Sequence, residues 1–308
     1  MRIGRRTVEV SSREKVYFPD AGITKGELVD YYREIAPHLI RHARGRLVSM
    51  QRFPDGIHGP RFYQKDVPDH FPDWIHTEVV EKKEGTLRQL VIDDAATLVY
   101  LADQGCITPH VWLSRVDRVR YPDRMVVDLD PPGEDPREVF PGVRRAARQV
   151  RELVEEVGLV PFLMTSGSRG LHIHVPLDRG ADFDEVRSFA ADLGDLLVAR
   201  DPERLTRAHR KEQRGDRIFV DILRNAYAQT AVAPYAVRAR EGAPVATPLE
   251  WEELDDPALH PRAHTLRTLL RRLEEHPDPW KGMGRRARGL ERPRWVLDRL
   301  MEEARAGA

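Results

Sequence analysis

The chain has 308 residues, of which 41% are hydrophobic and 32% are charged, which is enough apolar material for one large domain or two packed modules. Basic and acidic residues number 50 each, so the net charge is zero and any surface that binds nucleic acid must be local. The single cysteine, Cys106, excludes internal disulfides and cysteine-based zinc sites and fits a reducing compartment.

The sequence carries no sign of a membrane segment. It contains no apolar run of roughly eighteen residues, which is the length that a membrane-spanning helix needs. The first residues, Met1–Arg6, lack the apolar part of a signal peptide. We therefore expect a cytoplasmic protein without membrane contacts.

The first predicted helix follows a short extended segment, Ser11–Pro19. Thr24 and Glu27 form a capping box, and apolar residues at helical spacing continue to about residue 43. Lys15 and Lys25 flank the start of this helix, which is a natural site for an anion. The alternative is that both lysines are solvated surface charges.

Two strands are predicted next, Leu47–Phe53 and Arg61–Lys65, separated by a Pro-Asp-Gly turn. Phe62 and Tyr63 point to opposite faces of the second strand, so we expect at least one of them to be exposed near Lys65. An exposed aromatic ring near a lysine can stack on an unpaired base. Packing in the core is the alternative for the other ring.

A hairpin and a short helix are predicted to follow. Trp74–Val80 and Leu87–Ile92 have strand composition, and Asp93 is the expected N-cap of a helix to about residue 102. Ile107–Leu113 is a further predicted strand, and it carries His110. A single histidine is more often structural than catalytic.

An apolar strand beginning at Met125 ends in two aspartates, Asp128 and Asp130. Their side chains point to the same side while Leu129 enters the core, and the prolines that follow end the strand. Neighbouring carboxylates repel each other unless a cation or a proton lies between them, and carboxylate oxygens suit Mg²⁺ or Mn²⁺. An isolated Asp-x-Asp is also typical of a solvated turn.

A long helix is predicted from Asp135, its N-cap, to Gly158. The strand that follows it ends at Thr165. Because a helix connects the two strands, we expect them to run parallel.

The turn Ser166–Gly170 is predicted to bind an anion, since glycines let successive amides converge and Ser166 adds a hydroxyl. His172 and His174 then lie on one face of the next strand. A His-x-His pair can bind zinc, but no third nitrogen or sulfur ligand is evident.

A third carboxylate, Asp221, lies inside the otherwise apolar strand 217–225, where a charge is costly unless it is paired or bound to a metal. The basic stretch before it, 200–217, includes Arg214 and is either a solvated helix face or a rim that faces phosphates. Three carboxylates on neighbouring strands beside a phosphate-binding turn predict a two-metal site for phosphoryl or nucleotidyl transfer.

The order of these motifs resembles a known family. Asp128-Leu-Asp130, Ser166-Gly-Ser-Arg-Gly-Leu-His172 and Asp221 are similar to the three signature motifs of the archaeo-eukaryotic primase superfamily. More narrowly, the chain from about Arg13 to about Arg240 resembles the polymerase domain of bacterial ligase D, an end-joining enzyme. The resemblance implies an α+β fold of α/β type, in which an N-terminal α/β module packs on an RRM-like catalytic module.

The domain limits expected from this resemblance are 1–115 for a module that binds DNA ends, 116–245 for the catalytic core, and 246–308 for a helical extension. The resemblance also implies the site residues. Catalysis and the binding of two Mn²⁺ or Mg²⁺ ions would rest on Asp128, Asp130 and Asp221. The nucleotide would contact Ser166, His172, His110, Arg224, Asn225 and Arg238. DNA would contact Lys15, Lys25, Phe62, Tyr63, Lys65 and Arg214, the first two through a 5′-phosphate.

The implied function is template-directed addition of nucleotides, preferably ribonucleotides, to a 3′-OH at gaps and double-strand-break ends. The implied partners are NTPs or dNTPs, DNA ends that carry a 5′-phosphate, and the end-binding protein Ku. The implied location is the nucleoid. No Lys-x-Asp-Gly adenylation motif occurs in this sequence, so a separate ATP-dependent DNA ligase is expected to seal the break.

Three alternatives stay open. A primase would start chains without a primer, and a two-metal phosphatase or nuclease would use a similar set of carboxylates. A non-catalytic module that bridges DNA ends would need none of the three aspartates.

Overall fold

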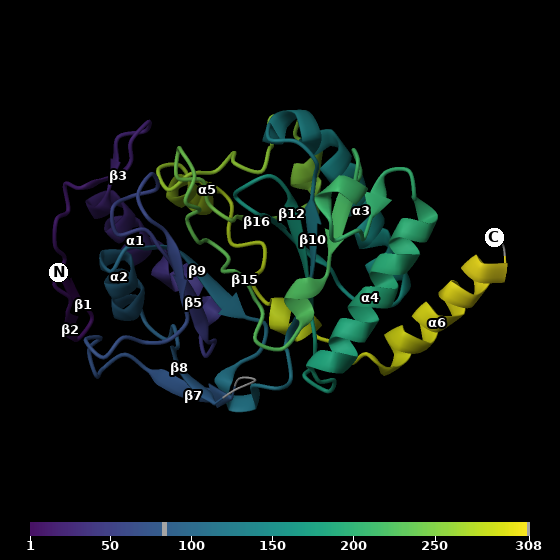
Figure 1. Cartoon of the computed structure of the whole chain (residues 1–308), viewed down its shortest axis with the longest axis horizontal. Helices are drawn as coiled ribbons and strands as arrows, with labels where there is room; N and C mark the ends of the chain where they lie inside the picture. The colour runs from purple at the N-terminus through teal and green to yellow at the C-terminus, as the bar shows by residue number, and fades with distance from the viewer. Residues whose placement is uncertain (82–84, 307–308) are drawn as a thin grey trace. The chain divides into compact units, whose positions relative to one another are not determined.

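The computed structural model describes residues 1–81 and 85–306, which form two compact units (Figure 1). Unit 1 comprises Met1–Asp117, Thr230–Thr247 and His264–Asp278, and unit 2 comprises Arg118–Gln229, Pro248–Ala263 and Pro279–Ala308. Each unit thus combines segments that are distant in the sequence. The domain limits at residues 115 and 245 stay a prediction.

Unit 1 has three α-helices among its described residues, and the first two begin at side-chain caps. The three are α1 (Lys25–Ala43), α2 (Ala95–Asp103) and α5 (Leu269–Glu275). The predicted capping box of α1 is present, because Thr24 accepts from the Glu27 amide and Glu27 accepts from the Thr24 amide. The N-cap of α2 is Asp94 and not Asp93. The Asp93 carboxylate instead accepts from the Gly45 amide and pairs with His76.

A four-stranded antiparallel sheet forms the centre of unit 1, in the order β15-β9-β5-β6. Its strands are β5 (Val48–Arg52), β6 (Phe62–Gln64), β9 (Cys106–Trp112) and β15 (Thr230–Val232). Two-stranded sheets are formed by β1 (Arg2–Ile3) with β2 (Arg6–Thr7), β3 (Val16–Phe18) with β4 (Ile23–Thr24), and β7 (Thr77–Glu81) with β8 (Thr86–Leu90). Cys106 is buried as expected, and burial raises the pKa of its thiol to about 12.

Unit 2 is built on a six-stranded sheet in the order β13-β14-β10-β12-β11-β16. Its strands are β10 (Arg124–Asp130), β11 (Phe162–Thr165), β12 (Leu171–Pro176), β13 (Leu205–Thr206), β14 (Ile218–Asp221) and β16 (Pro248–Leu249). Both β10 and β11 are antiparallel to β12. They are therefore parallel to each other, as the connecting helix predicted, but β12 lies between them.

Two helices cover one face of this sheet. The helices of unit 2 are α3 (Pro136–Glu156), α4 (Phe183–Arg200) and α6 (Glu291–Ala306). Asp135 caps α3 as expected, and α3 and α4 lie together beside β10 and β12 (Figure 1). Val127, Leu129 and Val220 are fully buried in the core that these helices share with the sheet. Since side chains alternate along a strand, the residues between them occupy the other face.

Within the described residues, we find no helix with both the length and the apolar character needed to cross a bilayer.

Candidate active site

Three strands of unit 2 place one polar residue each in a row across the sheet. Asp221 of β14 is directly opposite Asp128 of β10, and Asp128 is directly opposite His172 of β12. Directly opposite residues on antiparallel strands have their side chains on the same face. The Nε2 atom of His172 accordingly lies 3.4 Å from Oδ1 of Asp128. The register therefore brings Asp128, Asp221 and His172 together, from segments almost a hundred residues apart.

Asp130 lies on the same face as Asp128, two residues along β10, and two arginines hold its carboxylate. Arg169 donates to Oδ1 at 2.8 Å, and Nη1 of Arg214 is 3.4 Å from Oδ2. The Arg214 guanidinium also stacks over the Phe219 ring at 3.8 Å. The expected DNA contact of Arg214 stays a prediction, since here the side chain is engaged with Asp130.

Arg169 was missed as a site residue by the sequence analysis. Besides Asp130, it donates to the carbonyl of Gly133 at 3.2 Å. A signal was available, because Arg169 stands inside the motif that ends in His172. The motif pattern alone did not show that the turn folds back onto the end of β10.

The ionisation of Asp221 is affected by the charges of the neighbouring carboxylates. Burial and the neighbouring charge of Asp128 raise the pKa of Asp221. Two groups act in the opposite direction, the Leu223 amide that donates to Asp221 at 2.8 Å and the Arg224 guanidinium. Nε of Arg224 is 3.8 Å from Oδ2 of Asp128. A cation between Asp128 and Asp221 would relieve their repulsion.

The turn after β11 is organised by Ser166. Its hydroxyl accepts hydrogen bonds from the amides of Ser168 at 3.2 Å and Gly170 at 3.1 Å. These two amides therefore serve the turn itself rather than forming the open anion site that the sequence predicted. Gly170 packs against β10 so closely that an added Cβ would lie 1.8 Å from the Leu129 carbonyl oxygen. Only glycine fits at this position.

Asn225 is hydrogen-bonded to the backbone of β10 and of the segment after β14 in this structure. It is fully buried, and its amide accepts from the Val126 N–H at 2.8 Å and donates to the Val126 and Ile222 carbonyls. The side chain satisfies backbone groups of β10 that no strand pairs. The expected contact with the nucleotide sugar stays a prediction.

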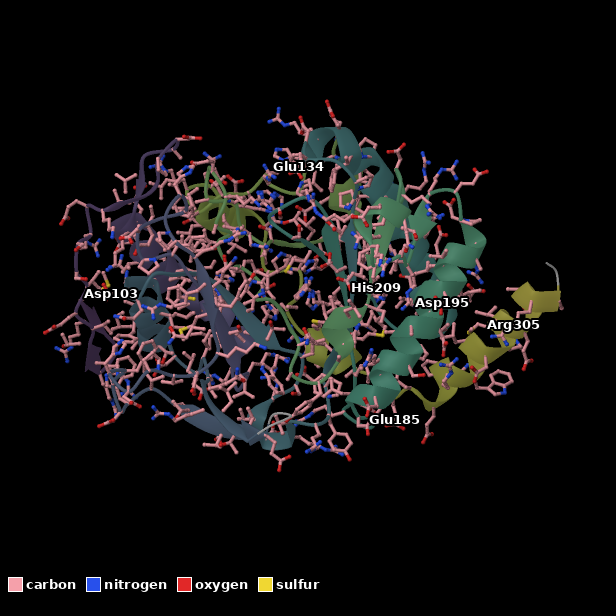
Figure 2. All side chains as sticks on the ribbon, viewed as in Figure 1. Asp103, Glu134, Glu185, Asp195, His209 and Arg305 are labelled. Atoms are coloured by element: carbon pink, nitrogen blue, oxygen red, sulfur yellow. The ribbon has the colours of Figure 1, made fainter. Side chains whose placement is uncertain are left out.

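The two lysines expected to bind a 5′-phosphate belong to unit 1 and are both paired. Lys25 is buried, 2.7 Å from Asp103 (labelled in Figure 2) and 3.1 Å from the Ser11 hydroxyl. Lys15 is 40% exposed, with its ammonium 2.5 Å from Asp55. The ammonium is exposed at Lys15 and buried at Lys25, and the 5′-phosphate contacts of both lysines stay predictions.

The aromatic pair of β6 is more exposed than expected, because neither ring enters the core. Phe62 is 43% and Tyr63 is 61% exposed, and Lys65 is exposed beside them. The Tyr63 ring meets the His110 ring edge-on, with centroids 5.7 Å apart. Two exposed rings beside a lysine are suited to stacking on bases.

The remaining predicted residue, Arg238, is half-buried in unit 1, and its amide donates to the Pro244 carbonyl.

A different group in unit 1 has the composition of a metal site. Ligand atoms of Asp20, His58 and Glu241 lie within 4.8 Å of one another. None of the predicted metal ligands belongs to this group.

Comparisons with known proteins agree with this geometry. Residues 24–280 match the family model described as "LigD, primase-polymerase domain". The chain is 34% identical over 262 residues to the multifunctional non-homologous end joining DNA repair protein LigD of Mycobacterium tuberculosis H37Rv, covering 82% of this chain and 34% of that protein. It is 37% identical over 276 residues to the multifunctional non-homologous end joining protein LigD of Pseudomonas aeruginosa, covering 89% and 32%.

The chain thus spans about a third of the length of these curated relatives. Among solved structures, it matches the polymerase domain from M. tuberculosis ligase D in complex with DNA. That match has a TM-score of 0.85 at 31% identity and covers 92% of this chain and all of the other. The chain therefore belongs to the LigD primase-polymerase domain family, and its α+β fold is the fold of that polymerase domain.

Proposed function

We propose that this chain is a template-directed repair polymerase that adds nucleotides to a 3′-OH at gaps and broken DNA ends. The observation that carries the proposal is the position of Asp128 directly opposite Asp221, with Asp130 on the same face of the sheet. The names of its relatives, which are non-homologous end joining proteins, support a place in DNA end joining. The similar structure that contains DNA supports DNA as the partner.

The three carboxylates would bind two divalent ions, Mn²⁺ or Mg²⁺. Asp128 and Asp130 would hold both ions, and Asp221, whose pKa is raised by burial and by the charge of Asp128, would hold one. When bound, such ions make the 3′-OH easier to deprotonate and neutralise charge on the phosphates. Asp130 can take part only after Arg169 and Arg214 release it.

The basic groups around the aspartates would bind the nucleotide. His172 and Arg224 both approach Asp128, so an incoming triphosphate that reaches the same ions would lie beside them. Arg169 and Arg214 become available for phosphates once they leave Asp130. Arginine suits this task because its planar fork donates two hydrogen bonds to one phosphate.

Unit 1 would supply the contacts to the DNA end. Lys15 is the exposed candidate for the 5′-phosphate, while Phe62, Tyr63 and Lys65 would meet unpaired template bases. His110 and Arg238 are the proposed nucleotide contacts of this unit. Ku and a separate ATP-dependent ligase are the proposed protein partners. The proposed polymerase prefers ribonucleotides to deoxyribonucleotides.

The deciding experiment is extension of a gapped duplex with a recessed 5′-phosphate, supplied with rNTPs or dNTPs in Mg²⁺ or Mn²⁺. We expect templated extension with release of pyrophosphate, faster with rNTPs, and its loss in Asp128→Ala. Release of free phosphate or mononucleotides would instead identify a phosphatase or nuclease. Synthesis without a primer would identify a primase, and unchanged end bridging without any synthesis would identify a non-catalytic module.

A further inference from the structure

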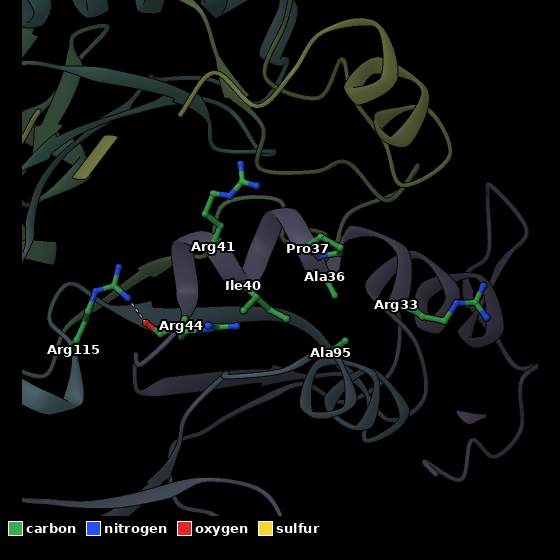
Figure 3. A pocket seen from close by; sticks show the side chains of 8 residues that line it. All are labelled: Arg33, Ala36, Pro37, Ile40, Arg41, Arg44, Ala95 and Arg115. Atoms are coloured by element: carbon green, nitrogen blue, oxygen red, sulfur yellow. Dashed lines mark hydrogen bonds between the residues drawn. The ribbon is translucent and has the colours of Figure 1, made fainter. Parts of the chain in front are cut away.

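A groove lined by α1, by the first residue of α2 and by Arg115 has the composition of an anion-binding surface. It encloses about 560 Å³, within the range of about 300–1,000 Å³ that is typical of ligand pockets. Four arginines line it, Arg33, Arg41, Arg44 and Arg115, and the other lining residues are all apolar. Figure 3 shows the arginines spread around these apolar residues, with Arg33 at one end and Arg115 at the other. We call this surface the arginine groove.

The charges of the arginine groove are only partly neutralised by the protein. Among residues 1–81 and 85–306, the Arg44 side chain has no hydrogen-bond or ion-pair partner. Arg41 is 3.5 Å from Asp278. That carboxylate has closer partners in His42 at 2.9 Å and the Tyr235 hydroxyl at 2.8 Å, so Arg41 can leave it at little cost.

Arg33 pairs with Glu34 at 2.9 Å and with Asp30 at 3.6 Å, and its guanidinium also lies 3.9 Å from the Met1 sulfur. The Arg33 side chain is 41% exposed, and exposed pairs contribute little. Helix stability explains why some of these arginines are present, since basic residues near the C-terminus of a helix interact favourably with its dipole. That reason applies to Arg41 and Arg44. It does not apply to Arg33, in the middle of α1, or to Arg115, which follows β9.

The floor of the groove favours a peptide over a nucleic acid. Pro37 and Ile40 form part of it, and an apolar floor suits a hydrophobic side chain. Pro37 has no N–H, so the Arg33 carbonyl lacks its usual donor four residues later in the helix. A peptide can donate a backbone N–H to such a carbonyl, whereas a phosphodiester backbone has no donor to offer.

We propose that the arginine groove binds an acidic segment of a partner protein, with an apolar side chain on the Pro37–Ile40 floor and carboxylates against the arginines. Arginine binds carboxylates through two parallel hydrogen bonds, so a few carboxylates give both affinity and orientation. This binding does not use the aspartates of the sheet, and it is independent of the proposed polymerase activity.

The test uses the full chain and a short fluorescein-labelled peptide of Glu and Asp around a central Leu pair, followed by fluorescence anisotropy. We expect binding that weakens with salt, and a roughly tenfold loss of affinity in Arg44→Glu and in Arg33→Glu. The matched control is Arg145→Glu, an exposed arginine of α3, which should leave the affinity unchanged. A peptide with Ser in place of the Leu pair should bind several-fold more weakly.

Two results would overturn the proposal. One is that the peptide does not bind, or that Arg145→Glu weakens binding as much as the groove variants do. The other is that Arg44→Glu lowers the affinity for a plain DNA duplex and not for the peptide, which would make the groove a nucleic-acid contact. Thermal melting of each variant checks its fold, and unchanged gap filling by Arg44→Glu would separate the groove from the polymerase site.

Discussion

Asp128 and Asp221 face each other across β10 and β14, and each is half-buried in a sheet whose other face packs on the apolar core. Burial and the charge of Asp128 together raise the pKa of Asp221. Repulsion between the two carboxylates destabilises the free protein. A cation bound to both carboxylates would remove this cost, so the cost can be measured in the metal-free protein.

The first prediction concerns Asp221→Asn. Gap filling should fall by roughly a hundredfold or more, because a metal ligand is lost. The metal-free protein should melt at a higher temperature, since the substitution removes the repulsion with Asp128. Extension kinetics and thermal melting in EDTA measure the two effects. An active variant, or one that is less stable without metal, would contradict the assignment.

The second prediction concerns the arginines on Asp130. Arg169→Ala should lower the dissociation constant for Mn²⁺ of the DNA-free protein by roughly threefold to tenfold, because the carboxylate no longer has to leave an ion pair. Titration of Mn²⁺ by calorimetry measures it. Arg187→Ala, at an exposed position of α4, is the control and should change nothing. Equal affinity in all three proteins would show that Arg169 does not compete with the metal.

The third prediction tests the contact between the 166–170 turn and β10. Gly170→Ala should lower the free energy of unfolding by about 1–3 kcal/mol, because its Cβ would overlap the Leu129 carbonyl oxygen. Gly284→Ala is the control, since nothing lies within 4 Å of the added Cβ at that position. Urea unfolding of both variants gives the comparison. A neutral Gly170→Ala would mean that the turn is free to move away from the strand.

The fourth prediction separates a structural role of Asn225 from a nucleotide contact. Asn225→Ala leaves the buried N–H and C=O of Val126 without partners, so stability should fall by about 2–4 kcal/mol. The ratio of KM for rNTPs to KM for dNTPs should stay as in the wild type, if the side chain serves only the Val126 backbone. A stable variant with an altered ratio would restore the original expectation.

The fifth prediction concerns pH. The hydrogen bond to Asp93 is the largest of the effects that raise the pKa of His76 above 6.5, and Glu78 adds to it. A raised pKa means that the stabilisation is fully present below about pH 6.5 and is lost as the pH rises through the folded-state value. His76→Gln should therefore lower stability at about pH 6 and have less effect at about pH 8. Urea unfolding of His76→Gln and the wild type at both pH values checks this. An equal loss of stability at both pH values would contradict a role for protonated His76.

Local signals in the sequence predicted much of the fold because they act over a few residues. Thr24 and Glu27 cap α1 as expected, and Asp135 caps α3. Alternation along β10 correctly placed Asp128 and Asp130 on one face. The helix between β10 and β11 correctly implied their parallel direction, but no local signal indicated that β12 lies between them.

What the sequence determined by itself was the identity and order of the acidic, turn and histidine motifs, because each is set by neighbouring residues and by strand alternation. Tertiary structure alone decided which of these groups meet. The strand register put Asp221 opposite Asp128, chain folding put Arg169 and Arg214 on Asp130, and packing buried Lys25 and Asn225. Pairing, burial and the resulting pKa shifts depend on distances between residues far apart in the chain, and no pattern of neighbours encodes those distances.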